Sequence, residues 1–98
     1  MFAALYTFTV KAGSEDKFRD AWRRLTEAIF AKHGSRGSRL HRGKGGIWFA
    51  YAQWPSREVW EQTRAQPSAN AEASAEMREC LAGPIETLLG EVCDDLLH

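Results

Sequence analysis

The sequence predicts an α+β fold: a ferredoxin-like, split βαβ arrangement in which helices cover one face of a four-stranded antiparallel sheet. Three observations carry this prediction. Residues 46–54 alternate like a strand, residues 15–33 repeat like an amphipathic helix, and the elements follow the order strand, helix, strand, strand, helix, strand. A length of 98 residues fits one domain, which we expect to span residues 1–98.

Residues 2–10 form the first expected element, a strand with one strongly apolar face. A turn at residues 11–13 leads to a helix that Ser14 is expected to cap, with Glu15 and Asp16 placed favourably near the positive end of the helix dipole. Apolar residues then recur at steps of three and four until Gly34 stops the helix: Phe18, Ala21, Trp22, Leu25, Ala28 and Ile29. This pattern predicts a helix that packs on the sheet.

A polar strand at residues 38–42 is expected to join the central strand, residues 46–54, through a glycine-rich turn in a hairpin. Strand alternation sends the central residues to two faces. One face carries Trp48, Ala50, Ala52 and Trp54, and the other carries Ile47, Phe49, Tyr51 and Gln53. The two alanines leave a gap between the indoles, which a neighbouring side chain fills or a ligand occupies.

The last third of the chain predicts two helical segments and a strand. Pro55 breaks the central strand, and Ser56 is expected to cap a short helix whose inward residues are Val59, Trp60 and Thr63. After an interruption at residues 67–70, a second helical stretch is expected over residues 71–82, before Gly83 and Pro84. We expect residues 85–97 to be the fourth strand.

One face of this sheet has no cover within the chain. Because both helical regions pack on one side, Leu5, Ile47, Phe49 and Tyr51 face outwards on the other. A chain of this length buries only about 60–65% of its unfolded surface, and an exposed apolar patch of this kind marks an interface. We therefore expect a homodimer in which two sheets meet across a two-fold axis and form an eight-stranded α/β barrel.

The composition indicates which binding partners and which cellular compartment to expect. Thirteen basic and thirteen acidic residues cancel, so nucleic acid is not expected as a partner. A local basic cluster reads as a solvated loop and hairpin, because no aromatic residue is interleaved with it: Lys32, Arg36, Arg39, Arg42 and Lys44. Cys80 and Cys93 lack metal-ligand spacing, and we expect free thiols in a reducing cytoplasm. We expect neither a signal peptide nor a membrane-spanning segment.

Four short stretches resemble the antibiotic biosynthesis monooxygenase family: Tyr51-Ala-Gln-Trp54, Ser56-Arg-Glu-Val-Trp60, Val10-Lys-Ala-Gly13 and Ala75-Glu-Met-Arg-Glu79. The resemblance covers approximately residues 2–96. It implies a dimeric α/β barrel, a fold that hosts several activities. Members include cofactor-free monooxygenases that oxidise polycyclic aromatic polyketides to quinones, haem-degrading proteins, quinol oxidases, and isomerases or degraders of signal molecules.

The resemblance to the quinone-forming members implies candidate site residues. Trp54 matches the tryptophan that ends their central strand, Arg78 matches the arginine of their last helix, and His41 lies near their strand histidine. Two positions depart from that pattern, because Ala50 replaces an asparagine and Trp60 replaces a tyrosine.

The haem-degrading members match less well. Their first-strand asparagine falls at about Tyr6, and the last helical region has no histidine for iron, since His33, His41 and His98 lie elsewhere. Haem degradation is therefore the weaker alternative.

The same residues can be assigned roles from chemistry alone, independently of the family resemblance. Oxygen reacts directly with an aromatic ring only when the ring is electron-rich, so a site must polarise a phenol, hold its plane and keep out water. Candidate catalytic residues are Trp54, Arg78 and His41, and candidate substrate-binding residues are Tyr6, Trp48, Ala50, Trp60 and Met77. We expect no metal and no cofactor.

Each candidate also has an ordinary structural interpretation. Indoles fill cores, an arginine at a helix boundary can reach solvent, and a strand histidine can simply be exposed. Two functions therefore stay open. One is a cofactor-independent monooxygenase, or related oxidoreductase, that acts on a small hydrophobic phenol or quinol. The other is a non-catalytic member that binds such a ligand.

Overall fold

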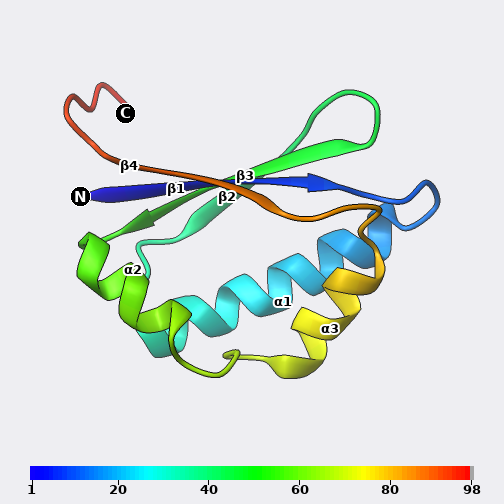
Figure 1. The fold of residues 1–98 in the computed structure, drawn as a ribbon, viewed down its shortest axis with the longest axis horizontal. Coiled ribbons are helices and arrows are strands. Elements are labelled where there is room, and N and C mark those ends of the chain that lie inside the picture. Colours follow the sequence, from blue (N-terminus) through cyan, green and yellow to red (C-terminus); the bar gives the residue numbers. More distant parts are fainter. Residues whose placement is uncertain (98) are drawn as a thin grey trace.

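Four strands and three helices make up the computed structural model, which describes residues 1–97 (Figure 1). The strands are β1 (Phe2–Thr9), β2 (Ser38–Arg42), β3 (Ile47–Trp54) and β4 (Glu86–Glu91). The helices are α1 (Glu15–His33), α2 (Arg57–Arg64) and α3 (Ala71–Glu79). One antiparallel sheet has the strand order β2-β3-β1-β4, which confirms the predicted ferredoxin-like α+β fold.

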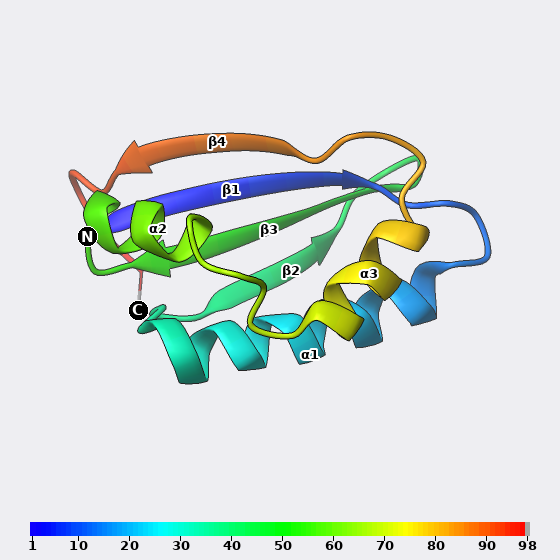
Figure 2. The ribbon, with the colours of Figure 1, turned by 60° about the horizontal axis from the view of Figure 1, so that its bottom comes forward.

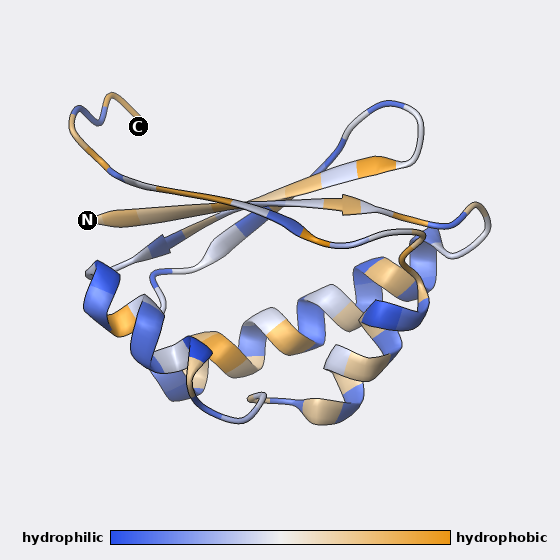
Figure 3. Ribbon diagram, viewed as in Figure 1, coloured by the Kyte–Doolittle hydropathy of each residue, from blue (hydrophilic) through white to orange (hydrophobic). Residues whose placement is uncertain are grey.

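All three helices lie on the same side of the sheet, and no helix covers the other side, which we call the bare face (Figures 1 and 2). Hydrophobic residues occur along β1 and β3 and recur along α1 (Figure 3). In β3 the residues Trp48, Ala50, Ala52 and Trp54 are buried, whereas the alternate residues are partly or fully exposed. The predicted assignment of the central strand to two faces is therefore confirmed.

The register of β1 against β3 determines which side chains lie next to each other on the covered face. Phe2 pairs with Trp54, Ala4 with Ala52, Tyr6 with Ala50, and Phe8 with Trp48. Directly paired residues project to the same side of an antiparallel sheet, so each large β1 side chain lies next to its β3 partner.

An aromatic cluster joins α1 to this face. Phe18 is fully buried, and its ring centroid lies 5.1 Å from that of Phe8 and 5.5 Å from that of Trp48, both in edge-on geometry. Such tilted contacts are favourable beyond the area they bury. They fix the first turns of α1 on β1 and β3.

Helix α3 packs on α1 through Ala73, Ser74 and Met77, which are buried. Two ion pairs connect the same helices at their surfaces: Lys17 with Glu79 at 2.8 Å, and Arg24 with Glu76. The hydrogen bond between Lys17 and Glu79 lowers the pKa of the Glu79 carboxyl and raises the pKa of the Lys17 ammonium. These contacts orient α3 about its axis.

The N-termini of α1 and α2 are capped in different ways. Ser56 caps α2 as predicted, because its Oγ accepts a hydrogen bond from the N–H of Val59 at 3.2 Å. Ser14 occupies the capping position of α1, but its side chain makes no such bond. The carboxylate of Glu15 instead folds back and accepts from the N–H of Gly13 at 2.9 Å.

Two predicted elements are longer than the observed ones. The helical stretch predicted over residues 71–82 ends at Glu79, because Leu81 bridges to Val10 and the N–H of Ala82 donates to the carbonyl of Thr9 at 2.8 Å. The strand predicted over residues 85–97 is only Glu86–Glu91. Glu91 already pairs with Phe2, so β1 has almost no backbone left to pair with the residues that follow.

The two thiols differ in exposure. Cys80 is buried and Cys93 is exposed, and both are free, as predicted. Burial raises the pKa of the Cys80 thiol. In the part of the chain that the structure describes, no helix combines the length and the apolar character needed to cross a membrane.

The aromatic cluster gives a stability prediction. We expect Phe18→Ala to lower the free energy of unfolding by about 3–5 kcal/mol, because it leaves a cavity between Phe8 and Trp48. Phe30→Ala, on the same helix but 58% exposed, is the matched control and should change it by less than about 0.5 kcal/mol. Chemical denaturation monitored by circular dichroism measures both, and equal midpoints for the two variants would contradict the proposed docking of α1.

Candidate functional site

A cavity of about 250 Å³ lies between the covered sheet face and the helices. Side chains from β1, β3 and all three helices line it, and apolar and aromatic groups dominate the wall near the sheet: Tyr6, Phe8, Trp22, Leu25, Ile29 and Trp54. The volume falls slightly below the roughly 300–1,000 Å³ that is typical of ligand pockets. The space therefore suits a small, flat ligand.

Trp54 lines the cavity and carries an indole donor without a protein partner. Its side chain is 4% exposed, and among residues 1–97 its indole Nε1 is buried and has no protein acceptor. A buried donor without a partner costs roughly 1–3 kcal/mol, so such groups are normally satisfied by a protein group, by water or by a ligand. The indole N–H of Trp54 is therefore the group in the cavity that most clearly lacks a hydrogen-bond acceptor.

A hydrogen bond between two other candidates fixes the position of Tyr6. The indole Nε1 of Trp60 on α2 donates to the hydroxyl of Tyr6 on β1 at 2.9 Å. Trp60 itself does not line the cavity, and its ring packs near Phe2 with centroids 5.9 Å apart. Tyr6 does line the cavity, and its hydroxyl hydrogen remains available to donate to a ligand.

Two arginines reach the cavity from different helices. Arg78 on α3 follows the buried Met77 and is exposed, and in the described part of the chain it forms no ion pair. Arg64 on α2 also lines the cavity, with its guanidinium 5.5 Å from the ring centroid of Trp60. Sequence analysis missed Arg64. Its spacing of four residues from the inward Trp60 was the signal that could have identified it.

Besides Trp60, three other predicted site residues lie outside this cavity. His41 lies on the bare face of the sheet, where its ring stacks on Phe49 at a centroid distance of 4.6 Å. Trp48 is buried beside Phe18, and Ala50 is fully buried in the same core cluster. The space predicted in front of both alanines therefore exists only at Ala52, which lines the cavity. The structure unites Tyr6, Trp54, Met77 and Arg78.

Histidines do not contribute to the cavity. His33 ends α1, His41 lies on the bare face, and His98 lies outside the described residues. Among residues 1–97, no three side chains of histidine, cysteine, aspartate or glutamate come together as a possible metal site.

The sequence profile of the antibiotic biosynthesis monooxygenase family matches residues 1–81. The chain belongs to this family. No curated protein matches it by sequence.

Solved structures resemble this family member over almost its whole length. SnoaB, a cofactor-independent oxygenase from Streptomyces nogalater, has a TM-score of 0.81 and 18% identity, covering 99% of this chain and 97% of that one. Rv0793 from Mycobacterium tuberculosis has a TM-score of 0.77 and 18% identity, with 98% of each chain covered. A conserved protein from Methanosarcina mazei Go1 has a TM-score of 0.76 and 15% identity, covering 91% of this chain and 89% of that one. At these identities the likeness establishes the fold.

The two alanines of β3 allow a matched test of where the cavity lies. We expect Ala50→Leu to lower the free energy of unfolding by about 1–3 kcal/mol, because it overpacks a filled core. Ala52→Leu enters open space, so we expect a much smaller loss of stability together with weaker binding of 1-naphthol. Thermal unfolding and titration of tryptophan fluorescence measure the two effects. Destabilisation by Ala52→Leu as large as that by Ala50→Leu would contradict this placement.

Proposed function

We propose that this family member is a cofactor-independent monooxygenase that acts on a small hydrophobic phenol or quinol held in the cavity. The observation that carries the proposal is the buried, unpaired indole N–H of Trp54 in an aromatic wall. A hydrophobic ligand with one or two oxygen atoms would satisfy this donor and fill the apolar space.

The residues of the cavity take separate roles in the proposed reaction. The guanidinium of Arg78 stabilises the ionised form of a bound phenol through a charge-assisted hydrogen bond, and the proton leaves to solvent at this exposed rim. Trp54 and Tyr6 donate to the substrate oxygen or to oxygen-derived negative charge. The apolar walls exclude water from the electron-rich ring.

The reaction can be written for an anthrone, which is in equilibrium with its phenolic tautomer. The deprotonated ring carbon gives an electron pair to dioxygen, and a carbon–oxygen bond forms. Cleavage of the oxygen–oxygen bond then releases one oxygen atom as water, while the other remains as the second carbonyl of the quinone. One anthrone and one dioxygen thus give one quinone and one water.

Oxygen uptake tests the proposed activity. Purified protein without added flavin or metal should consume dioxygen with anthrone faster than buffer alone, with one quinone formed per dioxygen. Trp54→Phe keeps an aromatic ring but removes the donor, and we expect a loss of about 10²-fold in kcat. Arg57→Ala, an exposed arginine outside the cavity, is the control and should leave kcat unchanged. Uptake no faster than the buffer rate would exclude this activity.

A second candidate function is binding of the same ligands without catalysis. Ala50 is buried and offers no polar group where the quinone-forming members have an asparagine, and Trp60 already occupies one acceptor position of the Tyr6 hydroxyl. Under this alternative 1-naphthol binds in the cavity, and no oxygen is consumed with anthrone.

We also propose that the protein is a homodimer that buries the bare face of the sheet. Across this face Leu88 pairs with Leu5, and Leu5 pairs with Tyr51, which makes an apolar row over β4, β1 and β3. Leu88 is 69% exposed and Ile47 is 37% exposed. A second copy of the same face would cover this surface through a two-fold axis.

A charge on the bare face tests the dimer. We expect Phe49→Asp to convert the dimer to monomer, because each subunit would bury a carboxylate in an apolar interface. Phe30→Asp makes the same change on the outer side of α1 and should leave the dimer intact. Light scattering at micromolar concentration measures the mass. A Phe49→Asp dimer would contradict the proposed interface.

A further inference from the structure

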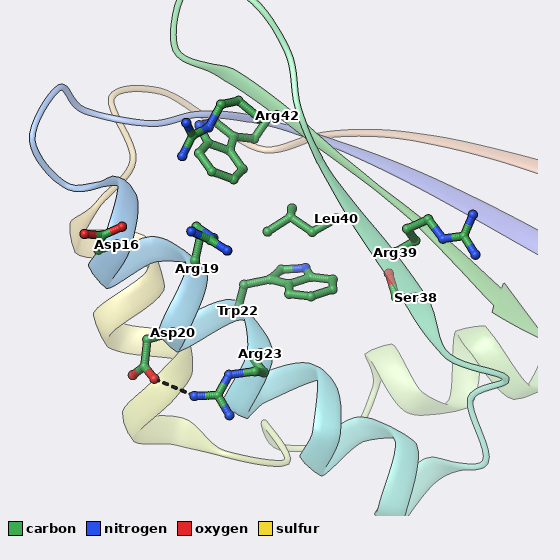
Figure 4. A pocket seen from close by; sticks show the side chains of 10 residues that line it. Asp16, Arg19, Asp20, Trp22, Arg23, Ser38, Arg39, Leu40 and Arg42 are labelled. Atoms are coloured by element: carbon green, nitrogen blue, oxygen red, sulfur yellow. Dashed lines mark hydrogen bonds and ion pairs between the residues drawn. The ribbon is translucent and has the colours of Figure 1, made fainter.

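A second hollow, of about 780 Å³, lies between α1 and β2 (Figure 4). Its charged lining consists of four arginines and two aspartates: Arg19, Arg23, Arg39, Arg42, Asp16 and Asp20. Asp20 already binds Arg23 and Arg24, each at 2.9 Å. Within residues 1–97, Arg19, Arg39 and Arg42 form no ion pair, so the hollow carries an excess of positive charge.

Two of these arginines approach the hollow from opposite walls. Figure 4 shows Arg19 beside Trp22 on the helix wall and Arg39 directed away from both. Arg42 approaches from the strand side, with its guanidinium 4.7 Å from the ring centroid of Trp48. Stacking on an indole leaves the N–H edge of a guanidinium free to donate. Arg19 and Arg42 are thus the available donors.

The remaining wall is apolar and flat. Trp22 from α1 faces Leu40 from β2 in Figure 4, and Trp48 lies beneath Arg42. The arginines of β2 therefore do have aromatic neighbours, which are Trp22 from α1 and Trp48 from β3. These residues are not interleaved with the arginines in the sequence. Indoles next to unpaired guanidinium groups match a planar aromatic ring that bears a carboxylate.

This outer hollow adjoins the inner cavity. Trp22 and Ser38 line both spaces, so a ligand held against Trp22 in the outer hollow lies next to the proposed reaction site. We propose that the outer hollow captures aromatic acids through Arg19 and Arg42, and that the substrate class is a hydrophobic phenol carrying a carboxylate. This inference rests on the proposed function, and it adds the acidic group and the residues that recognise it.

Two probes that differ by one carboxylate test this inference: 1-hydroxy-2-naphthoate and 1-naphthol. Titration of tryptophan fluorescence at low ionic strength should give an affinity about tenfold higher for the acid, the factor expected of one charge-assisted hydrogen bond. The preference should shrink as salt rises through 0.2 M, because the arginines are solvent-accessible.

Matched variants assign the preference to the proposed residues. The double variant Arg19→Gln/Arg42→Gln should bind both probes equally, and Arg19→Glu alone should favour 1-naphthol. Arg57→Gln is the control, because Arg57 also stacks on an aromatic ring, with its guanidinium 4.8 Å from the centroid of Phe2, yet lies outside both hollows. It should keep the full preference for the acid.

The outcomes separate this inference from the proposed function. Trp54→Phe should weaken 1-naphthol, which binds in the inner cavity, and leave the acid held by Arg19 and Arg42 unaffected, whereas the arginine variants should affect only the acid. Equal affinity of the wild-type protein for the two probes, binding of neither, or an acid preference that survives the double substitution would overturn the outer site. Oxygen uptake with anthrone, which has no carboxylate, depends on none of these results.

Discussion

The register between β1 and β3 is the constraint on which the rest of this structure depends. Side chains alternate between sheet faces, so a slip of one residue would move Tyr6 or Trp54 to the bare side. The observed register keeps both on the covered side, where the helices close the cavity. The apolar partners on that face make the register strongly favourable, because a slip of one residue would expose Phe2 and Phe8 to water.

Period-two and period-3.6 patterns were enough to predict the layers, the strand order along the chain and the buried face of β3. They could not distinguish Ala50 from Ala52, since both point to the same side and only the position of Met77 and the α1 side chains decides which one faces empty space. The position of His41 depended on the hairpin register, which a loop with three glycines leaves open. Arg64 lies in the short helix α2, whose orientation is set by tertiary contacts such as the bond between Trp60 and Tyr6.

Membership of the family and the details of the cavity address different questions. The profile match shows the family and the structural likeness shows the backbone fold, which many chemistries share. The cavity contains Trp54, which ends the central strand, and Arg78 from α3, while residue 50 is an alanine buried outside it. The polar groups that line this cavity are Trp54, Tyr6, the two arginines and several serine and threonine hydroxyls.

Trp22 has a role that follows from its position between two spaces. Its indole is half-buried and forms part of the wall of both the inner cavity and the outer hollow. Rotamers of exposed side chains change within picoseconds to nanoseconds, much faster than loops or domains move. A change of one side-chain torsion in Trp22 would alter the room available to a ligand while the sheet and helices stay in place.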